Sequence, residues 1–168
     1  MPANKTIILQ HQEIVQKITR MAWQILENNH DAGHLVIVGV EKKGTIVSKM
    51  LFAKLQEICD LQISHGSLFV DKNKPSLETI KLKCAVSLHD ANVILVDDVL
   101  NSGKTLMYAT LPILAQSPRQ LHTAILANRD HTRFPIKADF VGISLATTLQ
   151  EHIQFVQAEN KEMTVYLT

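Results

Sequence analysis

The stretch VILVDDVLNSGKT, residues 93–105, says more about the fold than any other part of the sequence. Its first four residues are aliphatic, which is typical of a parallel strand buried on both faces. Asp97 and Asp98 follow at once, and we expect the strand to end there. NSGKT, residues 101–105, then has the glycine and hydroxyl groups of a tight turn before a helix. The stretch therefore predicts a strand, an acidic loop and a helix in succession.

A second unit of the same kind lies earlier in the chain. LVIVGV (35–40) indicates a buried strand, EKKG (41–44) a loop, and the apolar residues from Ile46 to Ile58 a helix. Pro112 is expected to kink or shorten the helix that follows residue 105. Alternating strands and helices favour an α/β fold with a mainly parallel sheet covered on both faces. We also expect an amphipathic helix over 11–27 and further strands over 63–69, 121–127, 140–145 and 163–167.

Length and composition limit the remaining possibilities. The 168 residues are enough for one substantial core and too few for two comfortable domains, so we expect a single domain over 1–168. With 17 basic and 16 acidic residues, the chain has no global positive field that would attract nucleic acid. The sequence has no signal peptide and no apolar run of roughly 20 residues, so we expect a cytoplasmic protein without membrane association. Cys59 and Cys84 are expected to be reduced, partly buried thiols.

The two loops should meet at one edge of the sheet. Parallel sheets bind ligands at the carboxyl ends of their strands, and both 41–44 and 97–105 follow such ends. Backbone N–H groups and hydroxyls at the helix start form a cradle for a phosphate. Asp97 and Asp98 stay ionised only if they face solvent, a metal ion or hydroxyl groups. A sugar phosphate would satisfy both halves of the second loop.

Other interpretations of the same residues are weaker. A Walker A loop needs a glycine five residues before Gly103, where Asp98 stands. A receiver domain has its acidic pair after its first strand, and too little chain remains here after Asp98. The acids could instead only cap a turn while GKT starts a helix, and the sequence leaves that structural role open.

VILVDDVLNSGKT resembles the motif by which type I phosphoribosyltransferases bind 5-phosphoribosyl 1-pyrophosphate (PRPP). The resemblance covers most of the chain and is greatest to the pyrimidine operon attenuator group, regulators that also have uracil phosphoribosyltransferase activity. It is carried further by VGVEKKG (38–44), NRDH (128–131), PIKADFVG (135–142) and the opening helix. It implies transfer of phosphoribose to a nucleobase, with uracil as the leading acceptor, Mg²⁺ as cofactor and a dimer or larger assembly.

The resemblance also implies roles for individual positions. The ribose hydroxyls would be held, directly or through magnesium-bound water, by the catalytic and metal-binding pair Asp97 and Asp98. A flexible loop of about 70–90 would close over the site, beside a hood of about 128–160. The remaining contacts would be Asn101, Ser102, Gly103, Lys104 and Thr105 to the 5-phosphate; Glu41, Lys42, Lys43 and Gly44 to pyrophosphate; and Arg129, His131, Phe140 and Val141 around the base.

The sequence departs from the family pattern in three places. Asn101 replaces an aspartate that handles the base proton in purine enzymes, which disfavours a purine acceptor. Phe69 and Val70 replace a tyrosine–arginine pair, and Lys72 or Lys74 would have to supply the lost charge. Leu149 replaces a lysine expected to contact RNA phosphate. Two classes of function therefore remain open, namely an enzyme that makes a nucleoside monophosphate and a PRPP- or nucleotide-sensing regulator.

Overall fold

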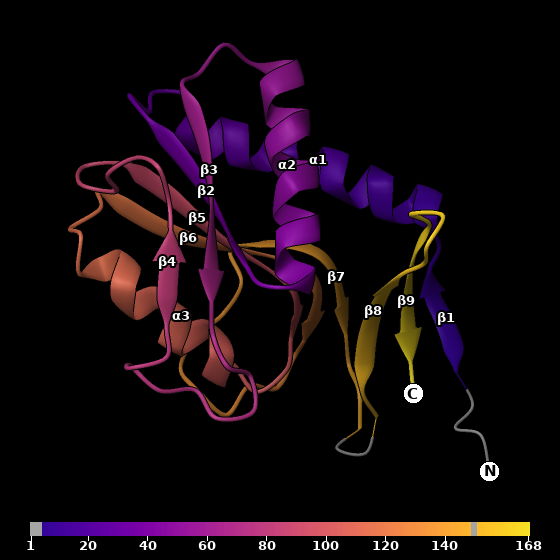
Figure 1. Cartoon of the computed structure of the whole chain (residues 1–168). Helices are drawn as coiled ribbons and strands as arrows, with labels where there is room; N and C mark the ends of the chain where they lie inside the picture. Colours follow the sequence, from indigo (N-terminus) through magenta and orange to yellow (C-terminus); the bar gives the residue numbers. More distant parts are fainter. Residues whose placement is uncertain (1–4, 149–150) are drawn as a thin grey trace.

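The computed structural model describes residues 5–148 and 151–168. This part of the chain forms three helices and nine strands (Figure 1). Both described ends of the chain lie in the same small sheet. The elements in chain order are β1 (Thr6–Leu9), α1 (His11–Asn29), β2 (Leu35–Val40), α2 (Lys43–Ile58), β3 (Ile63–Phe69), β4 (Lys81–Lys83), β5 (Asn92–Leu100), α3 (Lys104–Leu114), β6 (Gln120–Arg129), β7 (Phe140–Leu145), β8 (Ile153–Gln157) and β9 (Met163–Leu167).

The main sheet has six strands in the order β4-β3-β2-β5-β6-β7. Its neighbours are parallel except for β4, which runs antiparallel to β3. Alternate residues of the central strands enter two separate cores. Ile37 and Ile94 pack on the face covered by α1 and α2, whereas Val38 and Leu95 pack on the face covered by α3. The expected α/β fold with helices on both faces is confirmed.

β5 is longer than expected. The strand continues through Asp97 and Asp98 to Leu100, so the prediction that it ends at the acids is wrong. The reason is its neighbour β6, which pairs in register with β5 as far as Leu100 and Asn128. Continued pairing keeps the backbone of the acidic pair extended and fixed.

A second, three-stranded antiparallel sheet has the order β1-β9-β8. The sequence predicts β9, but not β1 or β8. The expected hood range of about 128–160 includes β7, which pairs with β6 in the main sheet. The small sheet instead combines a strand from near the start of the chain with two strands from near its end.

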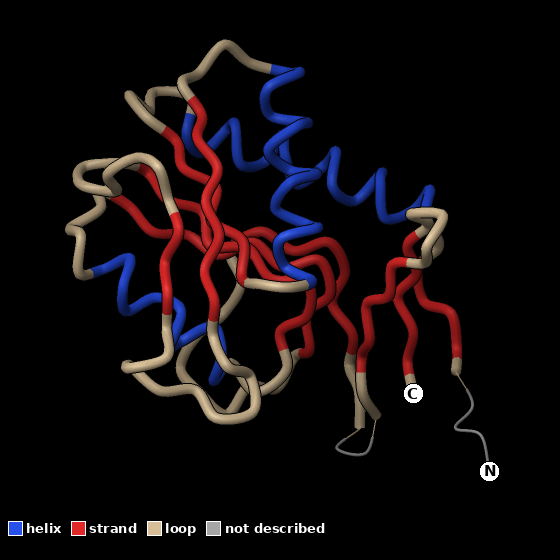
Figure 2. Tube along the Cα trace, in the orientation of Figure 1, coloured by secondary structure: helices blue, strands red, loops and turns tan. Residues whose placement is uncertain are grey.

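Figure 2 shows the segments that connect the helices and strands in tan. The stretch expected to form a flexible loop contains the short strand β4, and its other residues form turns, bends and irregular segments. α3 has 11 residues and ends two residues after Pro112, as expected for a shortened helix. Cys59 and Cys84 are free and half-buried. Across the described residues, none of the helices combines the length and apolar character needed to cross a bilayer.

Candidate functional site

The two loops do meet at one edge of the main sheet. β2 and β5 are parallel neighbours, α2 begins at Lys43, and α3 begins at Lys104. A Cβ atom added to Gly44 would lie 2.8 Å from Oδ1 of Asp97 and 2.9 Å from the carbonyl oxygen of Val96. Only glycine therefore lets the start of α2 approach the acidic strand this closely.

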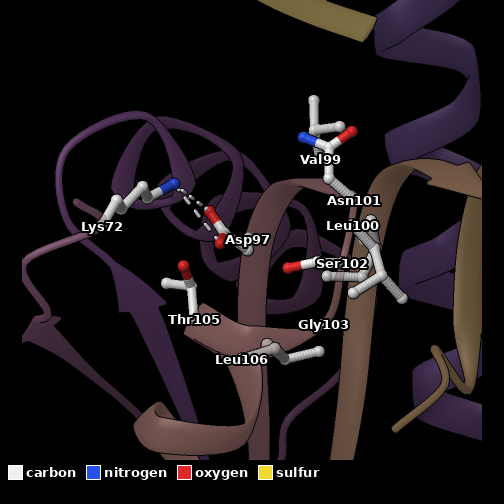
Figure 3. Close-up of a pocket in the computed structure, with 10 residues that line it drawn as sticks. Lys72, Asp97, Val99, Leu100, Asn101, Ser102, Gly103, Thr105 and Leu106 are labelled. Carbon is white, nitrogen blue, oxygen red and sulfur yellow. Dashed lines mark hydrogen bonds and ion pairs between the residues drawn. The ribbon is translucent and has the colours of Figure 1, made fainter. Parts of the chain in front are cut away.

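The acidic pair is almost fully buried. Asp97 is 3% exposed and Asp98 is 5% exposed. Lys72 reaches them from the segment after β3, and Figure 3 shows its side chain pointing towards Asp97. Its Nζ lies 3.2 Å from Oδ1 of Asp97 and 3.4 Å from Oδ1 of Asp98. The backbone N–H of Asp98 donates to Oδ1 of Asp97 over 2.9 Å. Two carboxylates thus share one ammonium group in a place with little water.

Burial and mutual repulsion disturb this pair. Burial, and then the charge of Asp98, raise the pKa of Asp97 well above its usual value, although Lys72 works in the other direction. Burial also works to lower the pKa of Lys72, but the two carboxylates outweigh it and the net pKa is raised. A buried carboxylate pair of this kind favours any cation that can reach it.

The residues present fit a magnesium ion that keeps most of its water. Within residues 5–148 and 151–168, no group of three or more histidine, cysteine or acidic side chains is placed to hold a metal. Mg²⁺ commonly binds through one or two carboxylates together with waters and substrate phosphates. Asp97 and Asp98 would supply the carboxylates, and the ligand would supply the rest.

A small cavity of about 80 Å³ lies beside Asp97. It is lined by four of the five residues expected to hold the 5-phosphate, which are Asn101, Ser102, Gly103 and Thr105 (Figure 3). Gly103 has φ +85°, a left-handed conformation that glycine adopts without strain. The fifth residue, Lys104, has an exposed side chain outside the cavity, and its backbone N–H donates to Oγ of Ser102. The first N–H groups of α3 have no acceptor within the helix and are suited to an anion.

A second pocket, of about 340 Å³, lies between the first loop and the end of β3. Glu41, Lys42 and Lys43, which are expected to bind pyrophosphate, line it together with residues 69–73. Gly44 is buried against Asp97 instead. The Glu41 carboxylate accepts a hydrogen bond from Ser67, and Lys43 Nζ donates to the carbonyl oxygen of Phe155 over 2.6 Å.

A third pocket, of about 440 Å³, lies between the phosphate loop and the segments that follow β6 and β7. Arg129 and His131, expected near the base, both line it. It shares Asn101 and Ser102 with the phosphate cavity, so the two hollows adjoin. The other residues of its lining fall within the expected hood range of about 128–160 but were not given roles individually, because they lie in irregular segments; they are Thr132, Arg133, Thr147 and His152.

Phe140 and Val141 lie outside this pocket. Phe140 is 6% exposed and packs in the core on the α1 face, with its ring edge-on to His122 at 5.9 Å. Its expected contact with a base is not supported, because β7 is a strand of the main sheet rather than of a hood. The carbonyl oxygen of Val141 accepts a hydrogen bond from Arg20 of α1. Leu149, expected to weaken RNA binding, lies outside the described residues.

Backbone hydrogen bonds join the segment that lines the third pocket to the phosphate loop. The carbonyl oxygen of Ser102 accepts backbone hydrogen bonds from Arg133 and Phe134, at 2.9 and 3.1 Å. A Cβ atom at Gly103 would lie 2.8 Å from Cγ2 of Ile136. The segment after β6 therefore packs directly on the turn that begins α3.

Known proteins are similar to this chain in sequence. The model of the phosphoribosyl transferase domain family matches residues 4–160. The bifunctional protein PyrR of Macrococcus caseolyticus is 31% identical over 98% of this chain and 99% of its own. The pyrimidine operon regulatory protein of Lactococcus lactis subsp. lactis is 33% identical over 94% and 92%.

A solved structure shares the same architecture. The hypoxanthine phosphoribosyltransferase of Trypanosoma cruzi superimposes with a TM-score of 0.79 at 19% identity, covering 95% of each chain. At that identity the likeness concerns the fold alone. The match of the family model over most of the chain carries the assignment, and the chain belongs to the phosphoribosyl transferase domain family as a type I phosphoribosyltransferase.

Proposed function

We propose that the protein transfers the 5-phosphoribosyl group of PRPP to a nucleobase, with uracil as the leading acceptor, and releases pyrophosphate. The observation that carries this proposal is a row of three adjoining hollows, one of which is lined by Asp97 of the buried acidic pair. The phosphate cavity adjoins Asp97, and the Glu41–Lys43 pocket shares Lys72 with that cavity. The Arg129–His131 pocket adjoins the phosphate loop.

Each hollow then takes one part of the donor or the acceptor. Residues 101–105 bind the 5-phosphate, mainly through backbone N–H groups at the start of α3. The first loop, 41–44, binds pyrophosphate, and the pocket lined by Arg129 and His131 takes the base. Asp97 and Asp98 hold the ribose hydroxyls, directly or through magnesium-bound water. A uracil acceptor is supported by the pyrimidine regulator among the relatives. Asn101 cannot act as a general base and therefore disfavours a purine, but it does not by itself identify uracil.

The reaction is a substitution at C1 of the ribose. A ring nitrogen of the base forms a bond to C1 while the bond to the pyrophosphate oxygen breaks, with positive charge developing on the sugar. Bound magnesium would neutralise charge on the leaving pyrophosphate. The protein contributes by holding donor and acceptor in line, by placing the acidic pair near the cationic sugar and by excluding water. No covalent nucleophile is needed.

Titration calorimetry with PRPP and magnesium chloride, followed by uracil, tests the proposal. We expect PRPP to bind and uracil to trigger release of pyrophosphate, which a coupled assay measures. Hypoxanthine in place of uracil serves as the purine comparison. Release of pyrophosphate with hypoxanthine but not with uracil would reject uracil as the acceptor. A protein that binds no PRPP would overturn the proposed function.

A double variant tests the role of the acidic pair. Asp97→Asn with Asp98→Asn should weaken magnesium-dependent PRPP binding at least about a hundredfold, or about 2.7 kcal/mol. The matched control, Asp31→Asn with Asp60→Asn, removes two exposed carboxylates that precede β2 and β3 at the opposite edge of the sheet. Circular dichroism checks that both proteins fold. Unchanged PRPP affinity in the Asp97 and Asp98 variant would remove these residues from the site.

A regulator that senses PRPP or a nucleotide is the second candidate. It is favoured by Val70, which replaces the arginine expected in the flexible loop and is only 2% exposed. The side chain of Val70 can give pyrophosphate neither charge nor hydrogen bonds. PRPP binding without release of pyrophosphate, whichever base is added, would favour this regulator over the enzyme.

A further inference from the structure

Lys72 holds a special position among the residues around the acidic pair. It lines both the phosphate cavity and the Glu41–Lys43 pocket. Its ammonium group lies 3.2 to 3.4 Å from three carboxylate oxygens of Asp97 and Asp98. The ammonium therefore stands where a cation bound to the same carboxylates would stand.

The contact has a clear electrostatic reason. Two carboxylates that are 3% and 5% exposed repel each other, and water cannot screen them well. One positive charge between them removes much of that cost. Lys72 can supply it from a flexible side chain, and that side chain remains 43% exposed despite its three contacts.

The segment that carries Lys72 is suited to movement. It follows β3 and leads through turns towards β4, and its neighbours Asn73 and Lys74 are exposed. Two local hydrogen bonds shape the turn, from the backbone N–H groups of Asn73 and Lys74 to Oδ1 of Asp71. Displacement of the ammonium thus breaks few other contacts.

We propose that Lys72 is an exchangeable counter-ion, which neutralises Asp97 and Asp98 in the free protein and moves to the pyrophosphate when magnesium and PRPP bind. The inference rests on the proposed function, because it assigns a cation site and a pyrophosphate site to the same cleft. It makes Lys72 a positioning residue for the donor, and it assigns to one lysine the charge that Val70 lacks.

Two arguments give the direction of the exchange. An ammonium ion and Mg²⁺ repel each other, so occupation of the carboxylates by the metal expels Lys72. The nearest alternative for the freed group is the pocket that it already lines, where pyrophosphate brings negative charge. Lys43 is less available there, because its Nζ donates to the carbonyl oxygen of Phe155.

Magnesium chloride alone is the first probe. Lys72→Met removes the competitor for the carboxylates, so we expect its affinity for Mg²⁺ to rise about tenfold, or about 1.4 kcal/mol. Titrations are run at about pH 8, because burial and the charge of Asp98 raise the pKa of Asp97 and alkaline solution favours the ionised carboxyl groups. Lys74→Met is the matched control, because Lys74 is exposed and lines neither pocket, and it should leave Mg²⁺ affinity unchanged. If Lys72 had only a structural role, its replacement by methionine would not raise the affinity for Mg²⁺.

Lysine acetylation followed by mass spectrometry is the second measurement. In the free wild-type protein Lys72 should react about tenfold more slowly than Lys74, and Asp97→Asn with Asp98→Asn should abolish the difference. Magnesium chloride should speed the reaction of Lys72, and PRPP added to it should slow the reaction again. The exchange is overturned if Lys72→Met binds Mg²⁺ no more tightly than the wild type, or if the Lys72 rate ignores both ligands. A wild-type protein that binds no PRPP would instead reject the proposed function.

Discussion

The two halves of β5 have similar burial and opposite chemistry. Val93, Ile94, Leu95 and Val96 are 0% exposed and alternate between the two apolar cores. Asp97 and Asp98 continue the same strand at 3% and 5% exposure, with carboxylates in place of methyl groups. The first half gains free energy by burial, whereas the second costs free energy, which the ammonium group of Lys72 partly offsets.

The difference explains how the site keeps its shape without a ligand. The apolar half anchors β5 between β2 and β6, and the continued pairing to Leu100 carries that rigidity into the acidic half. The strand pairing therefore holds the two carboxylates in a buried position that is unfavourable for their charge. The apolar half stabilises the fold and the acidic half destabilises it, as often happens where a site requires buried charge.

The largest expected effect comes from breaking the apolar half. Ile94→Ala removes a fully buried side chain packed in the core on the α1 and α2 face, and should lower the free energy of unfolding by about 3 kcal/mol. Urea denaturation measures the change. Val156→Ala on β8, where the side chain is 37% exposed, is the control and should cost below about 1 kcal/mol. Equal losses in both variants would mean that β5 is not the anchor.

A smaller effect of opposite sign is expected from the acidic half. Asp97→Asn removes a buried charge next to Asp98 and keeps an oxygen that can accept the Asp98 N–H bond. The free energy of unfolding should therefore rise by about 1 kcal/mol, which corresponds to about 3 °C in Tm. Thermal denaturation in the absence of ligands and divalent ions measures it, with Asp31→Asn as control. A loss of stability would show that the Lys72 contact outweighs the repulsion between the carboxylates.

The same contrast separates what the sequence could and could not predict. The strands at 35–40, 63–69, 140–145 and 163–167 were predicted with the bounds they have, because their apolar patterns are local. β1 escaped prediction because it pairs with β9 from near the other end of the chain, and that partner gives no local signal. β5 was cut short because carboxylates are poor predictors of a buried strand.

The candidate site divides in a similar way. Asp97, Ser102 and Gly103 could be placed from the sequence, since strand, acids and turn follow one another. Lys72 could be named only as a possible substitute for the lost arginine, because its contact with Asp97 spans 25 positions and depends on the folded sheet. Phe140 was correctly predicted to lie in a strand, but the family resemblance implied a contact with the base, whereas its side chain packs in the core on the α1 face.

The smallest predicted effect concerns a buried polar contact away from the acidic edge. Nε2 of His65 on β3 lies 2.8 Å from Oγ of the buried Ser48 on α2. Burial, and then the charge of Lys49, lower the pKa of His65 below 6.5. As the pH falls below about 6.5, the unfolded chain therefore takes up the proton first, and stability decreases until the folded pKa is passed.

His65→Gln tests this pH dependence. The variant should lose less stability than the wild type between pH 7 and 5, by a few tenths of a kcal/mol, because water screens a ring that is only partly buried. The difference between the two proteins is the quantity to measure, since the raised pKa of Asp97 makes an opposite contribution to stability as the pH falls and is common to both. His89→Gln, at an exposed position, is the control and should follow the wild type. If His65→Gln also followed the wild type, the contact with Ser48 would tolerate the protonated ring. Charge on His65 would then cost no stability, in contrast to charge on the acidic pair.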